Sequence, residues 1–95
     1  MKNMQVKLDE EFKKNFEIIF RYISKDKISA AKNFKKELFK QIKNIQNFPY
    51  KYRKSIYFEN KNIRDMIFKG YTIVYKVDTQ ENSINIADIF NHNKH

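Results

Sequence analysis

The second half of the chain carries basic and phenolic side chains whose types could bind and cleave a phosphodiester. The members of this set are Arg64, Lys69, Tyr71, Tyr75, Lys76 and His92. RNA cleavage by attack of the 2′-hydroxyl needs a base for its proton, cations that stabilise the phosphorane and an acid for the leaving oxygen, and side chains can supply these without a metal. Arg64 would suit the phosphate, and His92 or Tyr71 could transfer protons. The alternative is that Tyr71 and Tyr75 are amphipathic rings at the edge of a core, with their hydroxyls at its rim.

A predicted β-hairpin positions most of this set. Residues 62–75 form two runs with alternating apolar residues, joined at Lys69-Gly70, which contains the only glycine of the chain. A residue without Cβ suits a tight turn that demands a positive φ. Arg64 falls in the middle of the first run between apolar neighbours, where a cation needs a partner or a ligand.

Tyrosines and cations alternate just upstream, in residues 50–57. The cations are Lys51, Arg53 and Lys54. Cations neutralise phosphates while aromatic rings stack on unpaired bases, so this mixture fits a contact with single-stranded RNA. It fits equally well an ordinary loop whose tyrosine rings cover the edge of the core.

Several other kinds of site are poorly supported. The chain has no cysteine, which excludes disulfides and thiolate ligands, and its single glycine excludes phosphate-cradling loops and dinucleotide fingerprints. His92 and His95 lie in the last four residues, which is a poor basis for a metal site. A carboxylate pair for general acid–base catalysis is equally weak, because Asp65 and Asp88 are the only acids expected on the sheet and either could simply face solvent. We therefore expect no metal and no other cofactor.

The first part of the chain predicts a short strand and two helices. Residues 4–8 alternate as a strand does, and Asp9 can cap a helix that ends near Ser24-Lys25. The apolar stripe of this helix is Leu8, Phe12, Phe16, Ile19 and Ile23. Asp26 or Ser29 can cap a second helix, which must end before Pro49. Its stripe is Ala31, Phe34, Leu38, Ile42 and Ile45.

The opposite face of the second predicted helix is basic. It carries Lys32, Lys36, Lys40 and Lys43, spaced about one turn apart. Such a face is either a solvated surface that keeps the protein soluble or a track for a polyanion.

The order of elements predicts an α+β fold. A third strand, residues 83–90, follows a polar turn at residues 78–82, so the order is one strand, two helices and then three or four strands. Two consecutive helices cannot both cross over between parallel strands, so we expect a helical hairpin on one face of a small, mostly antiparallel sheet. The first strand should pair with a later one. We expect one domain over residues 1–95.

Charge and size limit the function further. Lys and Arg number 20 and Asp and Glu 11, a formal charge of +9, with +6 in residues 1–47 and +3 in residues 48–95. A compact basic domain attracts nucleic acid, nucleoprotein or an acidic protein. Codon use in an AT-rich genome would also favour lysine. No apolar run is long enough to span a membrane and no signal peptide is visible, so we expect a cytoplasmic protein.

These elements and residues resemble the RelE/ParE superfamily of toxins from bacterial type II toxin–antitoxin pairs. The resemblance covers nearly the whole chain. Its motifs are Ala30-Ala31 and Phe34 at the start of the second helix, Phe48-Pro49 after its end, Ile63-Arg64, residues 70–77 and residues 84–90. RelE-type nucleases usually carry an arginine where this chain has Thr72, and many relatives place another where residues 91–94 stand. Both departures favour the ParE-like branch.

The resemblance implies a growth-inhibiting toxin that a cognate antitoxin neutralises. The ParE branch implies DNA gyrase as the target, and the RelE branch implies messenger RNA cut on the ribosome by Arg64, Tyr71 and His92. A third possibility is a non-toxic basic module kept as an antitoxin partner. We expect the target or nucleic acid to contact Lys51, Arg53, Lys54, Lys69, Tyr75 and Lys76. We expect a small, acidic, DNA-binding antitoxin to contact Lys36, Lys40 and Lys43.

Overall fold

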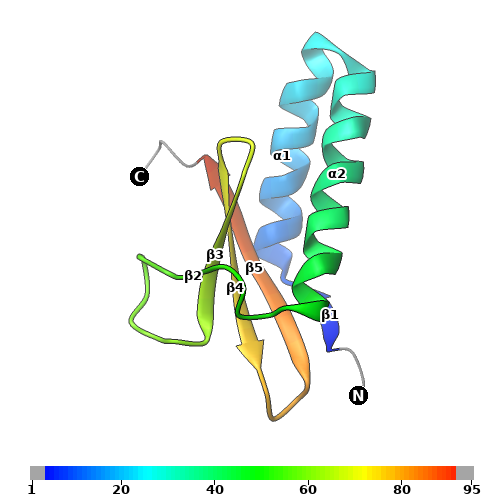
Figure 1. Ribbon diagram of the computed structural model, residues 1–95. Coiled ribbons are helices and arrows are strands. Elements are labelled where there is room, and N and C mark those ends of the chain that lie inside the picture. The colour runs from blue at the N-terminus through cyan, green and yellow to red at the C-terminus, as the bar shows by residue number, and fades with distance from the viewer. Residues whose placement is uncertain (1–3, 92–95) are drawn as a thin grey trace.

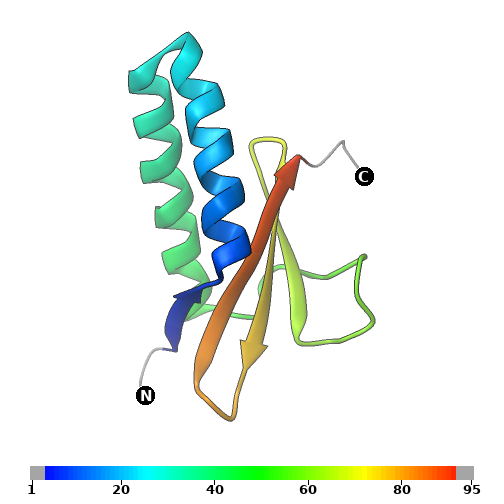
Figure 2. The ribbon, with the colours of Figure 1, turned by 180° about the vertical axis from the view of Figure 1, so that it is seen from behind.

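The computed structural model describes residues 4–91 and has two layers, a helical hairpin and a sheet (Figures 1 and 2). The elements, in chain order, are β1 (Gln5–Leu8), α1 (Glu10–Asp26), α2 (Ile28–Asn47), β2 (Arg53–Lys54), β3 (Ile63–Phe68), β4 (Tyr71–Asp78) and β5 (Ser83–Asn91). Both helices lie on one face of a five-stranded sheet with the order β1-β5-β4-β3-β2. The predicted α+β fold is confirmed.

The sheet is mixed and mostly antiparallel, because only β1 runs parallel to its neighbour. Residues Gln5 to Leu8 pair with Ser83 to Ile86 of β5. The other three pairs, β5–β4, β4–β3 and β3–β2, are antiparallel. The helical hairpin therefore carries the chain from one edge of the sheet, at β1, to the other edge, at β2.

A single residue separates the two helices, and it caps both. Lys27 is extended (φ −159°, ψ 117°), its N–H donates to Ile23 O at 3.1 Å, and its carbonyl accepts from Ala30 N and Ala31 N at 3.1 and 3.2 Å. The predicted caps at Asp26 or Ser29 are therefore wrong: the backbone of Lys27 already makes the first bonds of α2. Asp9 does occupy the N-cap position of α1, although its side chain makes no capping hydrogen bond.

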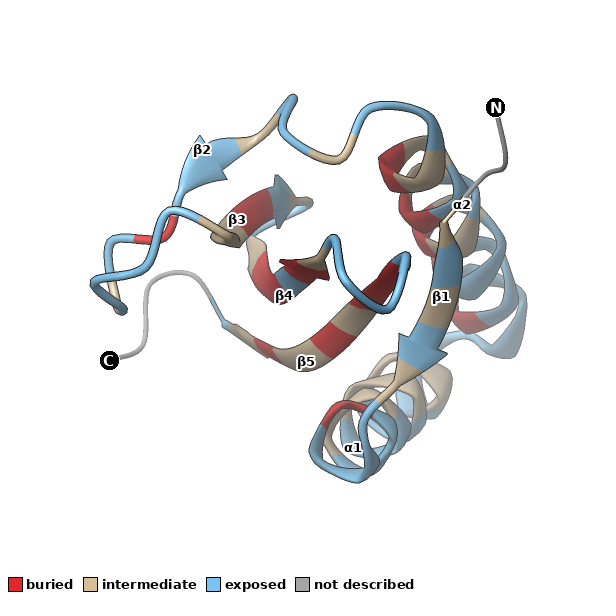
Figure 3. Ribbon diagram, turned by 90° about the horizontal axis from the view of Figure 1, so that it is seen from below, coloured by how far each residue is buried: buried red, intermediate tan, exposed pale blue. Residues whose placement is uncertain are grey.

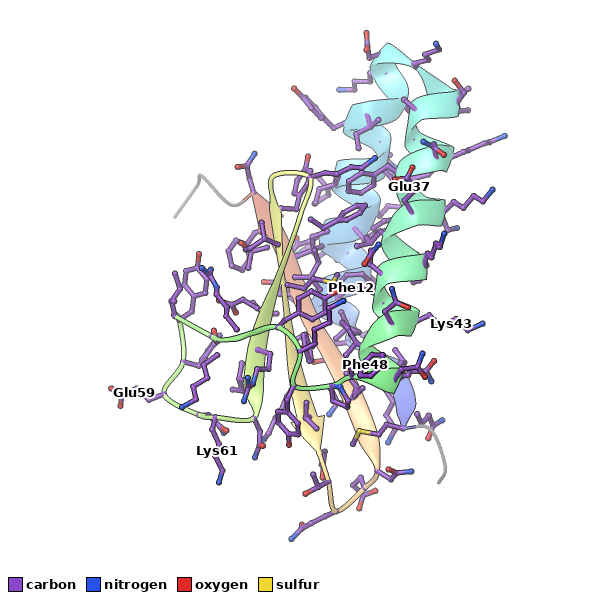
Figure 4. The ribbon with its side chains drawn as sticks, in the orientation of Figure 1. Phe12, Glu37, Lys43, Phe48, Glu59 and Lys61 are labelled. Carbon is purple, nitrogen blue, oxygen red and sulfur yellow. The ribbon has the colours of Figure 1, made fainter. Side chains whose placement is uncertain are left out.

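The core lies between the hairpin and the sheet. All five predicted stripe residues of α2 are buried, as is Phe12 of α1, which Figure 4 shows against the sheet. The rest of the predicted stripe is only partly buried: Leu8 lies in β1 and not in the helix, and the later part of α1 extends beyond the end of the sheet (Figure 1). This overhang leaves Ile18, Tyr22 and Ile28 exposed.

The β3–β4 turn sets which side chains of β3 face the helices. Lys69 and Gly70 both have positive φ, 48° and 85°, as a two-residue hairpin turn requires. Phe68 is then opposite Tyr71, and Arg64 is opposite Tyr75. Side chains alternate along a strand, so Arg64 lies on the same face as the buried Met66, towards the helices, and Asp65 lies on the other face.

The face of the sheet away from the helices is partly covered by the connection between β2 and β3, residues 55–62. Seen from below, this connection lies on the opposite side of the sheet from both helices (Figure 3). The ring of Tyr57 packs edge-on against Phe90 of β5, with centroids 5.3 Å apart. On this face the buried residues are Asp65, Thr72 and Val74. The sheet therefore packs against the connection on this side, over a smaller area than against the helices on the other.

Candidate functional site

Arg64, the strongest candidate from the sequence, is bound by the protein itself. Its Nε donates to Lys61 O at 3.0 Å, and its Nη1 donates to Tyr52 O at 3.0 Å and to Tyr50 O at 3.5 Å. The guanidinium carbon lies 4.9 Å from the centre of the Tyr50 ring, a cation–π contact. The partner that a mid-strand cation requires is thus backbone carbonyls of the connection between α2 and β3.

Tyr75 is part of the core and not of its rim. The residue is 0% exposed, and its hydroxyl donates to Pro49 O at 2.7 Å. Burial raises the pKa of this phenol above its usual value, since the phenolate would lose its hydration, although the nearby Arg64 opposes the shift. The predicted rim position of Tyr75 is wrong, and its buried side chain offers no surface to a target in this structure.

Asp65 is buried, contrary to the expectation that it could face solvent. It is 1% exposed, and its Oδ2 accepts from Ile56 N at 3.1 Å and from Arg53 Nη2 at 3.4 Å. Its Oδ1 has no hydrogen-bond partner. A buried carboxylate is costly unless it is paired, so this one holds the start of the 55–62 connection onto the sheet.

Asp88, the other acid expected on the sheet, lies at the β5 edge beyond the end of β1. Its Oδ1 accepts from Asn15 Nδ2 of α1 at 2.7 Å and from Ile89 N at 2.8 Å. It is half-buried, so it ties the strand to the helix and does not simply face solvent.

Two of the three residues proposed for RNA cleavage, Arg64 and Tyr71, lie apart in the structure. Tyr71 lies at the core edge, as one interpretation predicted, with its ring 5.5 Å from that of Phe34, and burial raises the pKa of its hydroxyl. Arg64 is opposite Tyr75 on β4, and Tyr75 is four residues from Tyr71, which corresponds to about 13 Å along an extended strand. His92 lies outside the described residues. Arg64 and Tyr71 thus stand near opposite ends of the β3–β4 hairpin.

The predicted contact cations occupy different parts of the surface. Lys51, Arg53 and Lys54 are exposed in the segment between α2 and β3, and Lys76 is exposed on β4. Lys69, in the β3–β4 turn, pairs with Glu37 of α2 at 3.0 Å and lowers the pKa of that carboxyl, chiefly through the hydrogen bond. The predicted lysine face of α2 is exposed, and Figure 4 shows Lys43 pointing away from the sheet.

The structure reveals two exposed apolar surfaces that the sequence did not. The first borders a groove between α1 and the ends of β4 and β5, with a volume of about 570 Å³. The groove is lined by Asn15, Ile18, Ile19, Tyr22, Tyr71, Ile89, Phe90 and Asn91. The second surface consists of Ile56, Phe58 and Ile67, on the 55–62 connection and the outer face of β3. Each surface joins residues from different elements, so the short spacings within them (Ile18 with Tyr22, Ile56 with Phe58) did not mark either surface in the sequence.

The part of the chain that the structure describes contains no group of three or more His, Cys, Asp or Glu side chains suited to a metal ion. Within those same residues, no helix has the length and apolar character needed to cross a membrane.

Comparison with known proteins assigns a family. Residues 6–95 match the model of the family described as the ParE toxin of the type II toxin–antitoxin system parDE. A chain from a solved structure described as the chromosomal ParDE TA system from P. aeruginosa aligns with a TM-score of 0.75 and 17% identity, over 93% of this chain and 95% of that chain. At that identity the likeness shows the fold. The comparison with curated proteins gave no match.

Proposed function

Because the chain belongs to the family of ParE toxins of type II toxin–antitoxin systems, we propose that it inhibits growth by binding DNA gyrase and that a cognate antitoxin neutralises it. One observation carries the choice of a binding mechanism. The best candidate for a transition-state cation, Arg64, makes its hydrogen bonds to backbone carbonyls of residues 50, 52 and 61. A catalytic cation must instead direct preorganised donors at the reacting phosphate.

The tyrosines support the same choice. Tyr75 donates its hydroxyl proton to a backbone carbonyl in the core, and Tyr71 lies towards the other end of the hairpin. General acid–base catalysis requires its groups within hydrogen-bond reach of one substrate. A protein that inhibits by binding has no such requirement.

The antitoxin is expected to be a small, acidic, DNA-binding protein that docks on the helical hairpin. The hairpin offers both components of such an interface: exposed apolar side chains on its overhang and an exposed lysine face on α2. An acidic segment that folds on binding would bury the apolar side chains and pair with Lys36, Lys40 and Lys43.

One observation favours a second candidate, the RelE-like nuclease. Lys51, Arg53 and Lys54 are exposed beside the exposed ring of Tyr50, an arrangement that single-stranded RNA can use. In that case the reacting phosphate would lie over this segment, and Arg64 would only hold the segment in place through its hydrogen bonds to the carbonyls of Tyr50 and Tyr52.

One set of assays separates the candidates. Induction of the chain alone should arrest growth, and co-expression with the antitoxin should restore it. The purified chain should block supercoiling by DNA gyrase in vitro, and messenger RNA in arrested cells should stay intact. Codon-registered cuts in messenger RNA with normal supercoiling would establish the nuclease instead. Normal growth at confirmed soluble expression would leave the non-toxic module.

A further inference from the structure

Exposed apolar residues also lie outside the hairpin that is assigned to the antitoxin: Phe48 and Tyr50 follow α2, and a separate surface lies on the other side of the sheet. This surface consists of Ile56, Phe58 and Ile67, whose residues are 67%, 52% and 43% exposed. Single exposed apolar residues are ordinary, but several that gather on one side of a molecule indicate a contact surface. Here they lie on the side of the sheet opposite the helices, which is the side covered by the 55–62 connection (Figure 3).

The connection that carries this surface is held at several points, which fixes the direction of its side chains. Ile56 N donates to the buried Asp65 at 3.1 Å, and Tyr57 N donates to Ser55 Oγ at 3.1 Å. The Tyr57 ring packs inward against Phe90. Ile56 and Phe58, on either side of Tyr57, remain exposed. Apolar anchors on a fixed backbone lose little conformational entropy on binding, which is the property of an interface centre.

The charges around this surface indicate the chemistry of its partner. Residues 53–61 hold three cations, Arg53, Lys54 and Lys61, and one acid, Glu59. Arg53 pairs with Asp65, which leaves Lys54 and Lys61 against Glu59. Figure 4 shows Lys61 and Glu59 projecting from the connection away from the sheet. A basic rim is complementary to an acidic one. Two of the three central side chains are isoleucines, which cannot stack on bases, so the surface fits a protein better than a nucleic acid.

We propose that Ile56, Phe58 and Ile67 form the apolar centre of the surface that docks onto the inhibited enzyme, in an apolar depression with an acidic rim. This inference rests on the proposed function and deepens it, because it names the part of the chain that meets the gyrase. It also places the target and the antitoxin on separate surfaces, the connection and the helical hairpin.

The test uses the full-length chain with Ile56→Ser and Phe58→Ser combined. Both changes keep the backbone N–H of residue 56 and the side chains of Asp65 and Tyr57, so the connection keeps its anchors. The concentration that half-inhibits gyrase supercoiling should rise by about 10–100-fold, the effect of truncating central interface anchors. The matched control is Ile18→Ser with Tyr22→Ser on the hairpin overhang, which should inhibit gyrase as the unmodified chain does but bind the antitoxin more weakly.

The outcomes are distinguishable. If the unmodified chain inhibits gyrase and the double variant inhibits it within about twofold, the docking surface is overturned and the proposed function stands. If the unmodified chain has no effect on supercoiling, the proposed function is overturned, and the inference with it. A double variant that keeps its gyrase inhibition but loses affinity for a single-stranded RNA oligonucleotide, or for phosphatidylglycerol vesicles, would assign the surface to those ligands and overturn the proposal.

A charge pair tests the same surface without removing apolar contacts, and so it remains informative if the serine variant fails to fold. Lys61→Glu should weaken inhibition, and Glu59→Lys should strengthen it, each by about two- to fivefold at low salt, with the difference shrinking as salt rises. Equal inhibition by both variants at low salt would overturn the acidic rim.

Discussion

Replacing Arg64 by alanine should destabilise the fold more than it alters any direct contact with a target. The change removes two charge-assisted hydrogen bonds of 3.0 Å to Lys61 O and Tyr52 O, a longer one to Tyr50 O, and the stacking on the Tyr50 ring. A hydrogen bond from a charged donor contributes about 1.5–3 kcal/mol and an exposed cation–π contact about 0.5–1 kcal/mol. Because the site is half-exposed and water can hydrate the freed carbonyls, we discount these values to their low end and below. The free energy of unfolding should fall by about 2–4 kcal/mol.

The assay is equilibrium unfolding in urea together with thermal melting. For a domain of this size, a loss of this magnitude lowers the melting temperature by roughly 10–25 °C. The matched control is Arg21→Ala, because the pair of Arg21 with Glu17 is a surface pair whose side chains are 76% and 62% exposed. That control should change the free energy of unfolding by less than about 1 kcal/mol.

One result would refute this view of Arg64. The Arg64→Ala variant could have the same melting temperature as the unmodified chain and yet lose inhibition of gyrase or cleavage of messenger RNA. In that case the arginine acts on the target and not on the fold. Arg64→Lys helps to interpret the data, because a lysine keeps the charge but lacks the fork that reaches several carbonyls. The Arg64→Lys variant should remain destabilised if the hydrogen bonds stabilise the fold. Its free energy of unfolding should return to that of the unmodified chain if the charge alone does so.

Three further predictions concern the anchors and the hairpin. Asp65→Ala should cost about 1–3 kcal/mol and expose the 55–62 connection to proteases at low concentration, whereas Asp65→Asn, which keeps an acceptor for Ile56 N, should resist cleavage better. The pKa of Tyr75 is raised in the folded state, so its contribution is fully present below the unfolded value near 10 and is lost as the pH rises above it. Urea unfolding between pH 9 and 11 should show that fall, and Tyr75→Phe should flatten it. Reversing Lys36, Lys40 and Lys43 to Glu together should weaken antitoxin binding at low salt, and a calorimetric affinity equal to that of the unmodified chain would exclude charge pairing on that face.

The sequence was sufficient for the two layers and for the central hairpin. The apolar period of α2 marks a stripe whose five members are all buried. The single glycine marks the β3–β4 turn, where the φ of Gly70 is 85°. Both features depend on neighbouring residues in the sequence, so they can be detected without knowledge of the rest of the fold.

The segment between α2 and β3 was not predictable in the same way. β2 has only two residues, Arg53 and Lys54, and both are exposed, so it has no hydrophobic alternation to detect. Its register places Arg53 opposite Asp65, and only that register shows why the acid is buried. The two helices were predicted, but the cap between them was not, since the backbone of Lys27 replaces the side-chain cap that sequence patterns signal.

Arg64, the cation that first suggested chemistry, is adjacent to Asp65 on β3, and the two residues act on opposite faces of the sheet. Arg64 faces the helix side and holds the carbonyls of residues 50, 52 and 61. Asp65 faces the other side and holds Ile56 N. The chain between α2 and β3 has little regular structure, so its backbone polar groups need partners from elsewhere. A mid-strand cation of this kind therefore suggests catalysis in the sequence while it positions a connection in the fold. The exposed side chains of that connection become the better candidates for contact with a target.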